Sequence, residues 1–459
     1  MSGITFTNLS GASEIGSNCY LLEVDGASFV LDVGMHPKKE GNAAKPYFEL
    51  LEGTDPDAVF VTHAHLDHIG TLPVLQELYP HAEVIMTPAT AGIGNTMLHN
   101  SVNVMSAKRM FDGIAEYPFF THGELERAAA QWVTRPYETP FRVGRHGEAL
   151  ATLYDAGHIL GSCGVLLETQ SGCNIFYTGD VQFEDQSIIS SARFPQSGVD
   201  VLIMECTHGA TERAADYSRR AELLRMAQTI RETLEGGGAV LIPVFALGKS
   251  QELLYELEQF RRKGLIPNAP IFFGGLGAKI TGLYDKFADE TPRLLPGMRL
   301  RNEVETTALP RASEAPLRAM PGNIYLVSSG MMSPHTLSNT LAAQVLPRAK
   351  DALLFVGYSD PDTPAARIKK AAPGDLVRLG ESPTQGQAYP VYCRVESFDF
   401  SGHAPRTAML DYAVKLAPKR ILLVHGDEAA LQEMRHRLQE LLPDSRVNIP
   451  LPGARVALG

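Results

Sequence analysis

One segment of the chain places three imidazoles and a carboxylate at the junction of a predicted strand and a predicted helix. The apolar strand covers residues 58–62 and runs directly into His63-Ala64-His65-Leu66-Asp67-His68. Apolar side chains then recur with the period of a helix face, at Ile69, Leu72, Leu75 and Leu78. A single histidine is usually a core or turn residue, but chance would give this four-residue pattern in only about one of 10³ such chains. Neutral imidazole and carboxylate are the usual ligands of zinc, so the segment predicts a metal site at a strand end.

Three further candidate ligands also stand at strand ends or beside glycines. His158 follows Gly157, Asp180 closes the predicted strand at 175–178, and His425 closes the predicted strand at 421–424. A neighbouring glycine lets the backbone turn sharply and aim a side chain. Each of the three is weak evidence by itself. Together with the cluster at 63–68 they complete a ligand set large enough for two ions.

The composition bounds the class of protein. The chain has 459 residues, 44% of them hydrophobic and 20% charged, which is enough for two or three globular domains. A net charge of −11 argues against a broad basic face for nucleic acid but leaves room for a local basic groove. No secretory signal and no apolar run of about 20 residues is present, so we expect a cytoplasmic protein. The five cysteines are scattered and odd in number, which indicates reduced thiols.

The distribution of apolar residues predicts an α/β (α+β) protein. Short apolar, β-branched runs indicate strands at 29–33, 58–62, 84–87, 165–168, 175–178, 199–204, 240–244, 324–327, 353–356 and 421–424. Helical periods follow Ser218 and Ser250 in the second half. The stretch 299–323 shows no clean period and is expected to be a loop or an irregular excursion.

The order of the candidate residues resembles that of the metallo-β-lactamase fold hydrolases and, within them, of the β-CASP nucleases. Asp32, the cluster at 63–68, His158 and Asp180 match the four motifs of the wider fold. Glu205 in Met204-Glu205-Cys206-Thr207, His403 in Phe400-Ser401-Gly402-His403-Ala404 and His425 in Leu423-Val424-His425-Gly426 look like motifs A, B and C of the β-CASP branch. Segments 243–252 and 327–331 also look like family segments, so the resemblance covers nearly the whole chain.

The resemblance implies an αββα sandwich of two sheets flanked by helices, interrupted by an inserted α/β β-CASP domain. The expected boundaries are 1–208 for the first part of the metallo-β-lactamase domain, 209–390 for the β-CASP domain and 391–459 for the C-terminal return segment. RNA is expected to enter a cleft between the two domains.

The resemblance also implies a role for each candidate residue. One zinc ion would be held by His63, His65 and His158, the other by Asp67, His68 and His425, with Asp180 as the bridge. Asp32 would orient the ligand loop without binding metal. His403 would contact the scissile phosphate or protonate the leaving oxygen, and Glu205 would hold its ring. The implied catalytic set is Asp67, Asp180, Glu205 and His403, and the implied phosphate-binding set is Ser328, Ser329, Gly330 and His403.

The function implied is a ribonuclease that hydrolyses RNA phosphodiester bonds with water activated by two zinc ions, in RNA processing or decay. Endonuclease action is favoured, with 5′-exonuclease action as the other mode. Two alternatives stay open: a hydrolase of small lactones, thioesters or phosphodiesters on the same fold, and a non-catalytic RNA-binding paralogue. Any processing partner is expected to be a separate protein or a second copy of this chain. The chain departs from the family pattern in three places. The family usually has an acid where this chain has Pro405, a glycine-rich continuation where it has Met332-Ser333-Pro334-His335, and a Gly-Arg element where it has Asp360-Pro361-Asp362-Thr363-Pro364.

Overall fold

The chain forms two compact units. The computed structural model describes residues 3–11, 14–310, 317–357, 359–380, 382 and 384–458. Unit 1 comprises Met1–Asp185, Ile189–Arg213 and His403–Gly459, and unit 2 comprises Gln186–Ile188 and Ala214–Gly402. All seven predicted metal ligands lie in unit 1, together with Asp32, Glu205 and His403.

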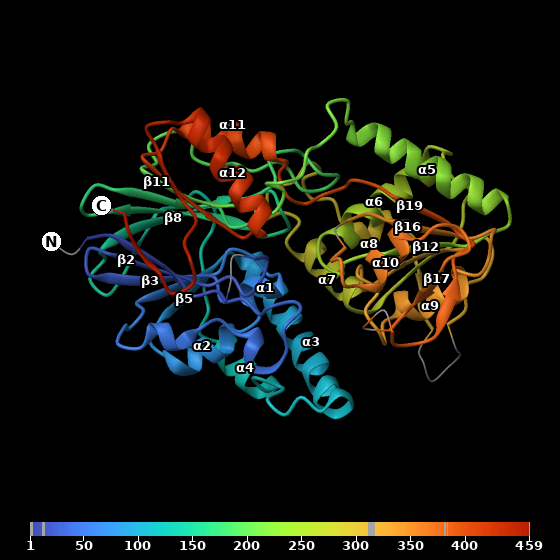
Figure 1. Ribbon diagram of the computed structural model, residues 1–459, viewed down its shortest axis with the longest axis horizontal. Helices are drawn as coiled ribbons and strands as arrows, with labels where there is room; N and C mark the ends of the chain where they lie inside the picture. The colour runs from blue at the N-terminus through green and yellow to red at the C-terminus, as the bar shows by residue number, and fades with distance from the viewer. Residues whose placement is uncertain are drawn as a thin grey trace. The chain divides into compact units, whose positions relative to one another are not determined.

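Two seven-stranded sheets form the centre of unit 1 (Figure 1). The first has the order β22-β1-β2-β3-β4-β5-β6 and the second the order β21-β20-β11-β10-β9-β8-β7. The strands of the first sheet are β1 (Thr5–Asn8), β2 (Tyr20–Val24), β3 (Ala27–Leu31), β4 (Ala58–Phe60), β5 (Glu83–Met86), β6 (Val133–Thr134) and β22 (Arg455–Ala457). Those of the second are β7 (Phe141–Val143), β8 (Ala149–Asp155), β9 (Cys163–Thr169), β10 (Asn174–Tyr177), β11 (Val201–Glu205), β20 (Arg420–Val424) and β21 (Arg446–Asn448).

A continuous apolar core fills the space between these two sheets. Phe6 and Phe60 of the first sheet belong to the same buried cluster as Leu167 and Ile203 of the second. Successive side chains of a strand point to opposite faces, so Val59, next to Phe60, faces the other way. It packs in a second cluster, under the helices, which explains why the strands are apolar on both faces.

Helices cover both outer faces of the sandwich (Figure 1). The first sheet is covered by α1 (Leu66–Ile69), α2 (Leu72–Leu78), α3 (Pro88–Asp112) and α4 (His122–Ala129), with two 3₁₀ turns at Gly41–Ala44 and Phe48–Leu51. The second is covered by α11 (Arg406–Leu416) and α12 (Glu428–Leu441). Pro405 occupies the cap position before α11, where the absence of a backbone N–H costs nothing. The predicted αββα sandwich is confirmed.

Unit 2 is built on a six-stranded sheet with the order β14-β13-β15-β12-β16-β19, in which every neighbouring pair is parallel. Its strands are β12 (Val240–Pro243), β13 (Ile271–Phe273), β14 (Thr307–Ala308), β15 (Ile324–Val327), β16 (Ala352–Phe355) and β19 (Arg394–Ser397), beside a hairpin of β17 (Leu376–Arg378) and β18 (Ala388–Pro390). Its helices are α5 (Arg219–Glu235), α6 (Lys249–Arg262), α7 (Gly275–Lys286), α8 (Leu300–Glu303), α9 (Leu337–Val345) and α10 (Pro364–Lys370). Parallel strands joined through helices make this unit the predicted α/β domain.

The structure agrees with the strand predictions. Each of the predicted strand segments overlaps a strand. The stretch 299–323 contains the short helix α8 and the short strand β14, and its residues 311–316 lie outside the described part of the chain. Unit 2 extends from 214 to 402, since β19 pairs with β16 and extends its sheet, and it also includes residues 186–188. These compact units differ in extent from the predicted domains, whose boundaries at 208 and 390 stay a prediction. Within the described residues, every helix is too short or too polar to cross a bilayer.

Candidate metal centre

The candidate centre is built on the turn that joins β4 to α1. His65, in extended conformation, is the residue from which α1 begins. Backbone hydrogen bonds from Val33 to His68 and from Met35 to Leu66 hold this turn against the end of β3. Gly34 permits the close approach, because a Cβ atom there would lie 1.8 Å from a backbone oxygen of the turn. The turn therefore directs the side chains at 63–68 into one place.

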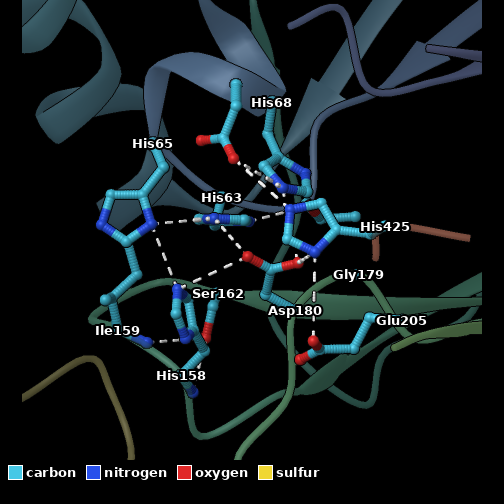
Figure 2. Close-up of polar contacts among 12 residues, drawn as sticks. His63, His65, His68, His158, Ile159, Ser162, Gly179, Asp180, Glu205 and His425 are labelled. Atoms are coloured by element: carbon cyan, nitrogen blue, oxygen red, sulfur yellow. Dashed lines mark hydrogen bonds and ion pairs between the residues drawn. The ribbon is translucent and has the colours of Figure 1, made fainter. Parts of the chain in front are cut away.

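Four of the predicted ligands meet in the first group. Nδ1 of His65 lies 3.1 Å from Nε2 of His63 and 3.1 Å from Nε2 of His158. Oδ2 of Asp180 lies 3.5 Å from Nε2 of His63 and 3.7 Å from Nε2 of His158. Figure 2 shows these rings and the carboxylate converging. Ligand atoms of a tetrahedral zinc ion are about 3.4 Å apart when the bonds are about 2.1 Å, so the spacing of the group fits such an ion.

Local structure holds the two residues of the first group that come from the second sheet, His158 and Asp180. His158 follows β8, and the hydroxyl of Ser162 accepts hydrogen bonds from the backbone N–H groups of His158 and Ile159 at 3.2 and 3.3 Å (Figure 2). Asp180 follows β10 after Gly179, whose φ of +55° is a conformation that favours glycine. A strand end followed by a tight turn is thus used twice more to present a ligand.

The second group contains Asp67, His68 and His425. Oδ2 of Asp67 lies 3.4 Å from Nε2 of His425 and 3.8 Å from Nε2 of His68. The other ring nitrogen of His68, Nδ1, hydrogen-bonds to Oδ2 of Asp32 at 2.8 Å, which leaves Nε2 directed at the group. Asp32 is fully buried and touches the ligand ring from behind, where sequence reasoning expected it.

The carboxylate of Asp180 links the two groups. Its Oδ2 belongs to the first group, and its Oδ1 lies 3.4 Å from Nε2 of His68 and 3.4 Å from Nδ1 of His425. Oδ1 is buried without a hydrogen-bond partner among the described residues. A buried anionic oxygen of this kind is costly unless a cation neutralises it. The residues present therefore fit a divalent metal, and the donor set of imidazoles and carboxylates suits zinc.

The protonation of His63, His65 and Asp180 fits metal binding. Burial, together with the charge of His68, lowers the pKa of His63 well below its usual value, and burial lowers the pKa of His65 to about 4. Burial opposes ionisation of Asp180, but His425 and His68 outweigh it and hold the pKa of this carboxylate well below its usual range. Neutral imidazoles and ionised carboxylates are the forms that bind a cation. Burial lowers the pKa of His68, but Asp180, Asp32 and Asp67 outweigh it and raise this pKa well above its usual value, so a cation would displace a proton there.

His403 and Glu205 form a buried pair beside the first group. Both carboxylate oxygens of Glu205, at the end of β11, contact Nδ1 of His403 at 3.1 and 3.2 Å. Oδ2 of Asp180 lies 4.0 Å from the same nitrogen. Burial lowers the pKa of His403, but Glu205 and Asp180 outweigh it and raise the pKa to about 9. The ring centroid is 4.5 Å from that of His158 and the side chain is 22% exposed, so substrate can reach it.

The predicted phosphate-binding residues Ser328, Ser329 and Gly330 lie in unit 2, in the loop that follows β15. The hydroxyl of Ser329 accepts a hydrogen bond from the backbone N–H of Ser333 at 3.1 Å. The backbone carbonyl of Ser329 accepts one from the hydroxyl of Ser338 at 2.7 Å. These contacts form the loop itself, and phosphate binding there stays a prediction.

Sequence reasoning missed several side chains that hold the ligands. Tyr177 donates a hydrogen bond to Asp32 at 2.7 Å, and the side-chain amide of Asn18 donates to the carbonyl of Asp67 at 3.1 Å. The hydroxyls of Thr62 and Thr207 lie at Nδ1 of two ligand histidines. Threonine at the end of a strand is common, so only its place directly beside His63, or two residues after Glu205, could have drawn attention to it.

Models of known families match three parts of the chain. They are described as the metallo-beta-lactamase superfamily (residues 13–209), the Beta-Casp domain (250–368) and the Zn-dependent metallo-hydrolase RNA specificity domain (388–450). The chain is 27% identical over 462 residues to "Endoribonuclease ysh1" of Schizosaccharomyces pombe, covering 97% of this chain and 57% of that one. It is 28% identical over 455 residues to "Cleavage and polyadenylation specificity factor subunit 3-I" of Arabidopsis thaliana, covering 97% and 62%.

The chain thus spans somewhat more than half the length of these curated relatives. Among solved structures, a protein of unknown function from Enterococcus faecalis V583 matches with a TM-score of 0.54 at 16% identity, over 99% of this chain and 100% of that one, which shows the fold alone. The three matched domains, in an order that agrees with the two units and the motifs, show that the chain belongs to the metallo-β-lactamase superfamily and, within it, to the β-CASP family.

Proposed function

We propose that the protein is an endoribonuclease that hydrolyses RNA phosphodiester bonds with two zinc ions per chain. The observation that carries the proposal is the pair of ligand groups that share Asp180, with His403 and Glu205 at their side. Relatives over 97% of the chain bear the names of an endoribonuclease and of a cleavage factor, which supports RNA as the substrate. The match to an RNA specificity domain at 388–450 supports the same class.

In this proposal His63, His65 and His158 hold one ion, Asp67, His68 and His425 the other, and Asp180 lies between them. Bound zinc lowers the pKa of a water molecule to near neutrality and stabilises charge on phosphoryl oxygens. The partly exposed carboxylate of Asp67 accepts a hydrogen bond that orients the attacking water.

His403 acts on the other side of the phosphorus. Glu205 engages Nδ1, so the proton that His403 gives to the leaving ribose oxygen is the one on Nε2. Ser328, Ser329 and Gly330 are proposed to bind a neighbouring phosphate through hydroxyl and backbone N–H groups, since such loops form anion-binding concavities.

The test compares substrates under one metal condition. Single-stranded RNA should be cleaved internally and faster than a chromogenic phosphodiester, a lactone or a thioester, and its binding should weaken as salt rises because phosphate contacts release counterions. The Asp180→Ala protein serves as the inactive control. Equal or better turnover of a small substrate would assign a small-molecule hydrolase instead, and metal-loaded protein that binds RNA without cutting it would assign a non-catalytic paralogue.

A further inference from the structure

Two threonine hydroxyls contact candidate ligand histidines at Nδ1, while Nε2 of each ring faces a carboxylate of its ligand group. Oγ1 of Thr62 lies 3.1 Å from Nδ1 of His63, and Oγ1 of Thr207 lies 2.9 Å from Nδ1 of His425. Thr62 follows β4 in the first sheet and Thr207 follows β11 in the second. His63 belongs to the first ligand group and His425 to the second. Each proposed ion thus has one threonine behind one of its histidines.

The direction of the hydrogen bond at Thr62 follows from its other contacts. The hydroxyl lies 3.0 and 2.9 Å from the two carboxylate oxygens of Asp32, which also accept hydrogen bonds from the backbone of Thr62 and from Tyr177. A hydroxyl has one proton, and here it goes to the carboxylate. The oxygen of Thr62 therefore accepts a hydrogen bond from Nδ1–H of His63. The hydrogen bond selects the neutral tautomer of His63 that carries its hydrogen on Nδ1. The lone pair of Nε2 then points toward Oδ2 of Asp180, 3.5 Å away.

The surroundings of His425 select the same form of the ring. Two carboxylate oxygens, Oδ1 of Asp180 at 3.4 Å and Oε2 of Glu205 at 4.0 Å, also face Nδ1. The two carboxylates favour the tautomer with its hydrogen on Nδ1, and the hydroxyl of Thr207 then accepts a hydrogen bond from that N–H. The lone pair of Nε2 points toward Asp67, whose Oδ2 is 3.4 Å away.

The contact at Thr207 also decides between two ligand groups that the geometry permits. His425 can be grouped with Asp67 and His68 through Nε2, or with Asp180 and Glu205 through Nδ1. A nitrogen that carries a proton and donates a hydrogen bond to Thr207 has no lone pair for a metal. His425 is then confined to the first alternative, and Glu205 stays with His403.

We infer that Thr62 and Thr207 are positioning residues that set the tautomers of His63 and His425, so that each ring presents Nε2 to a different metal ion. Removing either hydroxyl should weaken the binding of one zinc ion and leave the binding of the other unchanged. Loss of an outer hydrogen-bond partner of a metal-binding histidine typically lowers metal affinity about 10–100-fold. The inference concerns retention of metal, and it rests on the proposed two-ion site.

The experiment measures metal retention on the full chain loaded with Zn²⁺, by dialysis against graded chelator followed by elemental analysis. Thr62→Val and Thr207→Val keep the shape of the side chain and remove the hydroxyl, and each should release one equivalent of zinc at about 10–100-fold lower chelator concentration than the parent. Thr62→Ser and Thr207→Ser, which restore the hydroxyl, should retain zinc as the parent does. Thr71→Val is the matched control, because Thr71 is fully buried in unit 1 and its hydroxyl bonds only to backbone carbonyls at 33 and 34.

Double variants identify which ion is affected. Thr207→Val should not lower zinc retention further when it is combined with His425→Ala, but should lower it further when combined with His63→Ala. Thr62→Val should lower zinc retention further with His425→Ala and not with His63→Ala. Circular dichroism of every variant checks the fold. The inference is overturned if the valine variants retain zinc like Thr71→Val, or if serine fails to restore retention. A parent that retains two zinc ions, shows these effects and does not cut RNA would overturn the proposed function and leave the inference standing.

Discussion

Removing the imidazole of His403 should separate the proposed nuclease mechanism from generic zinc hydrolysis. His403 belongs to neither of the two groups proposed to hold metal, yet its ring lies beside His158 and its side chain is partly exposed. We expect His403→Ala to keep its zinc and its fold and to cut RNA about 10²–10⁴-fold more slowly, the usual contribution of a positioned proton donor.

The contacts of Glu205 predict that Glu205→Gln slows RNA cleavage less than His403→Ala does. The carboxylate makes a charge-assisted contact with Nδ1 of His403, and a neutral amide would make a hydrogen bond about half as strong. The difference is about 1–1.5 kcal/mol, or a 5–10-fold slower rate. Oε1 also accepts a hydrogen bond from the backbone of Val181 at 2.7 Å, so the substitution has to keep its oxygen there.

The assay is single-turnover cleavage of an end-labelled RNA by protein whose zinc content has been measured. The double variant separates a shared role from two independent ones, because Glu205→Gln should have little further effect when His403 is absent. If fully metal-loaded His403→Ala protein cleaves at the parent rate, His403 is structural and the proton-donor role is wrong. If the two losses multiply in the double variant, Glu205 acts independently of His403.

Three further outcomes follow from the contacts described. Asp180→Ala should lower the zinc content of both ligand groups, because Oδ2 faces one and Oδ1 the other; loss of a single equivalent by elemental analysis would contradict the shared role. Phe60→Ala, in the core between the sheets, should lower the free energy of unfolding by about 3–5 kcal/mol in denaturant titration, whereas Leu78→Ala at an exposed site should change it little. Burial raises the pKa of Asp155 to about 7, so the folded state binds an extra proton between the unfolded pKa near 4 and pH 7, and stability should fall as pH rises through that window. The difference in unfolding free energy between the parent and Asp155→Asn should therefore change from pH 4 to pH 7 and level off above; a constant difference would contradict the raised pKa.

The parts of the fold that the sequence could predict are those that local pattern determines. The strand that leads into His63 and the helical period after His68 are both visible as patterns of consecutive residues. The structure has a strand and two helices there. The candidate ligands at 158, 180 and 425 could be proposed because each stands at a predicted strand end or beside a glycine. The extent of unit 2 could not be predicted, because the strand 394–397 belongs to it only through its pairing with β16, some forty residues earlier.

Hydrogen-bond partners were the least predictable part of the site. Thr62 and Tyr177 carry no pattern in the sequence. Thr62 meets Asp32 because β3 and β4 pair in the first sheet, whereas Tyr177 reaches it only after the two sheets have packed face to face. The roles of Ser328 and Ser329 rest on resemblance, since the structure shows only how these residues form their own loop.

Strand register explains how a site can be assembled from segments so far apart in the chain. β11 and β20 pair in parallel, with Val201 opposite Arg420 and Glu205 opposite Val424. This ladder places His425, the next residue, beside the end of β11, although the 189 residues 214–402 of unit 2 come between the two strands in the sequence. Parallel pairing requires a long connection in any case, so an entire α/β unit can occupy it without altering the register. The residues of unit 2 are therefore free to vary, while the register of these two strands keeps Glu205 and the candidate ligand His425 in place.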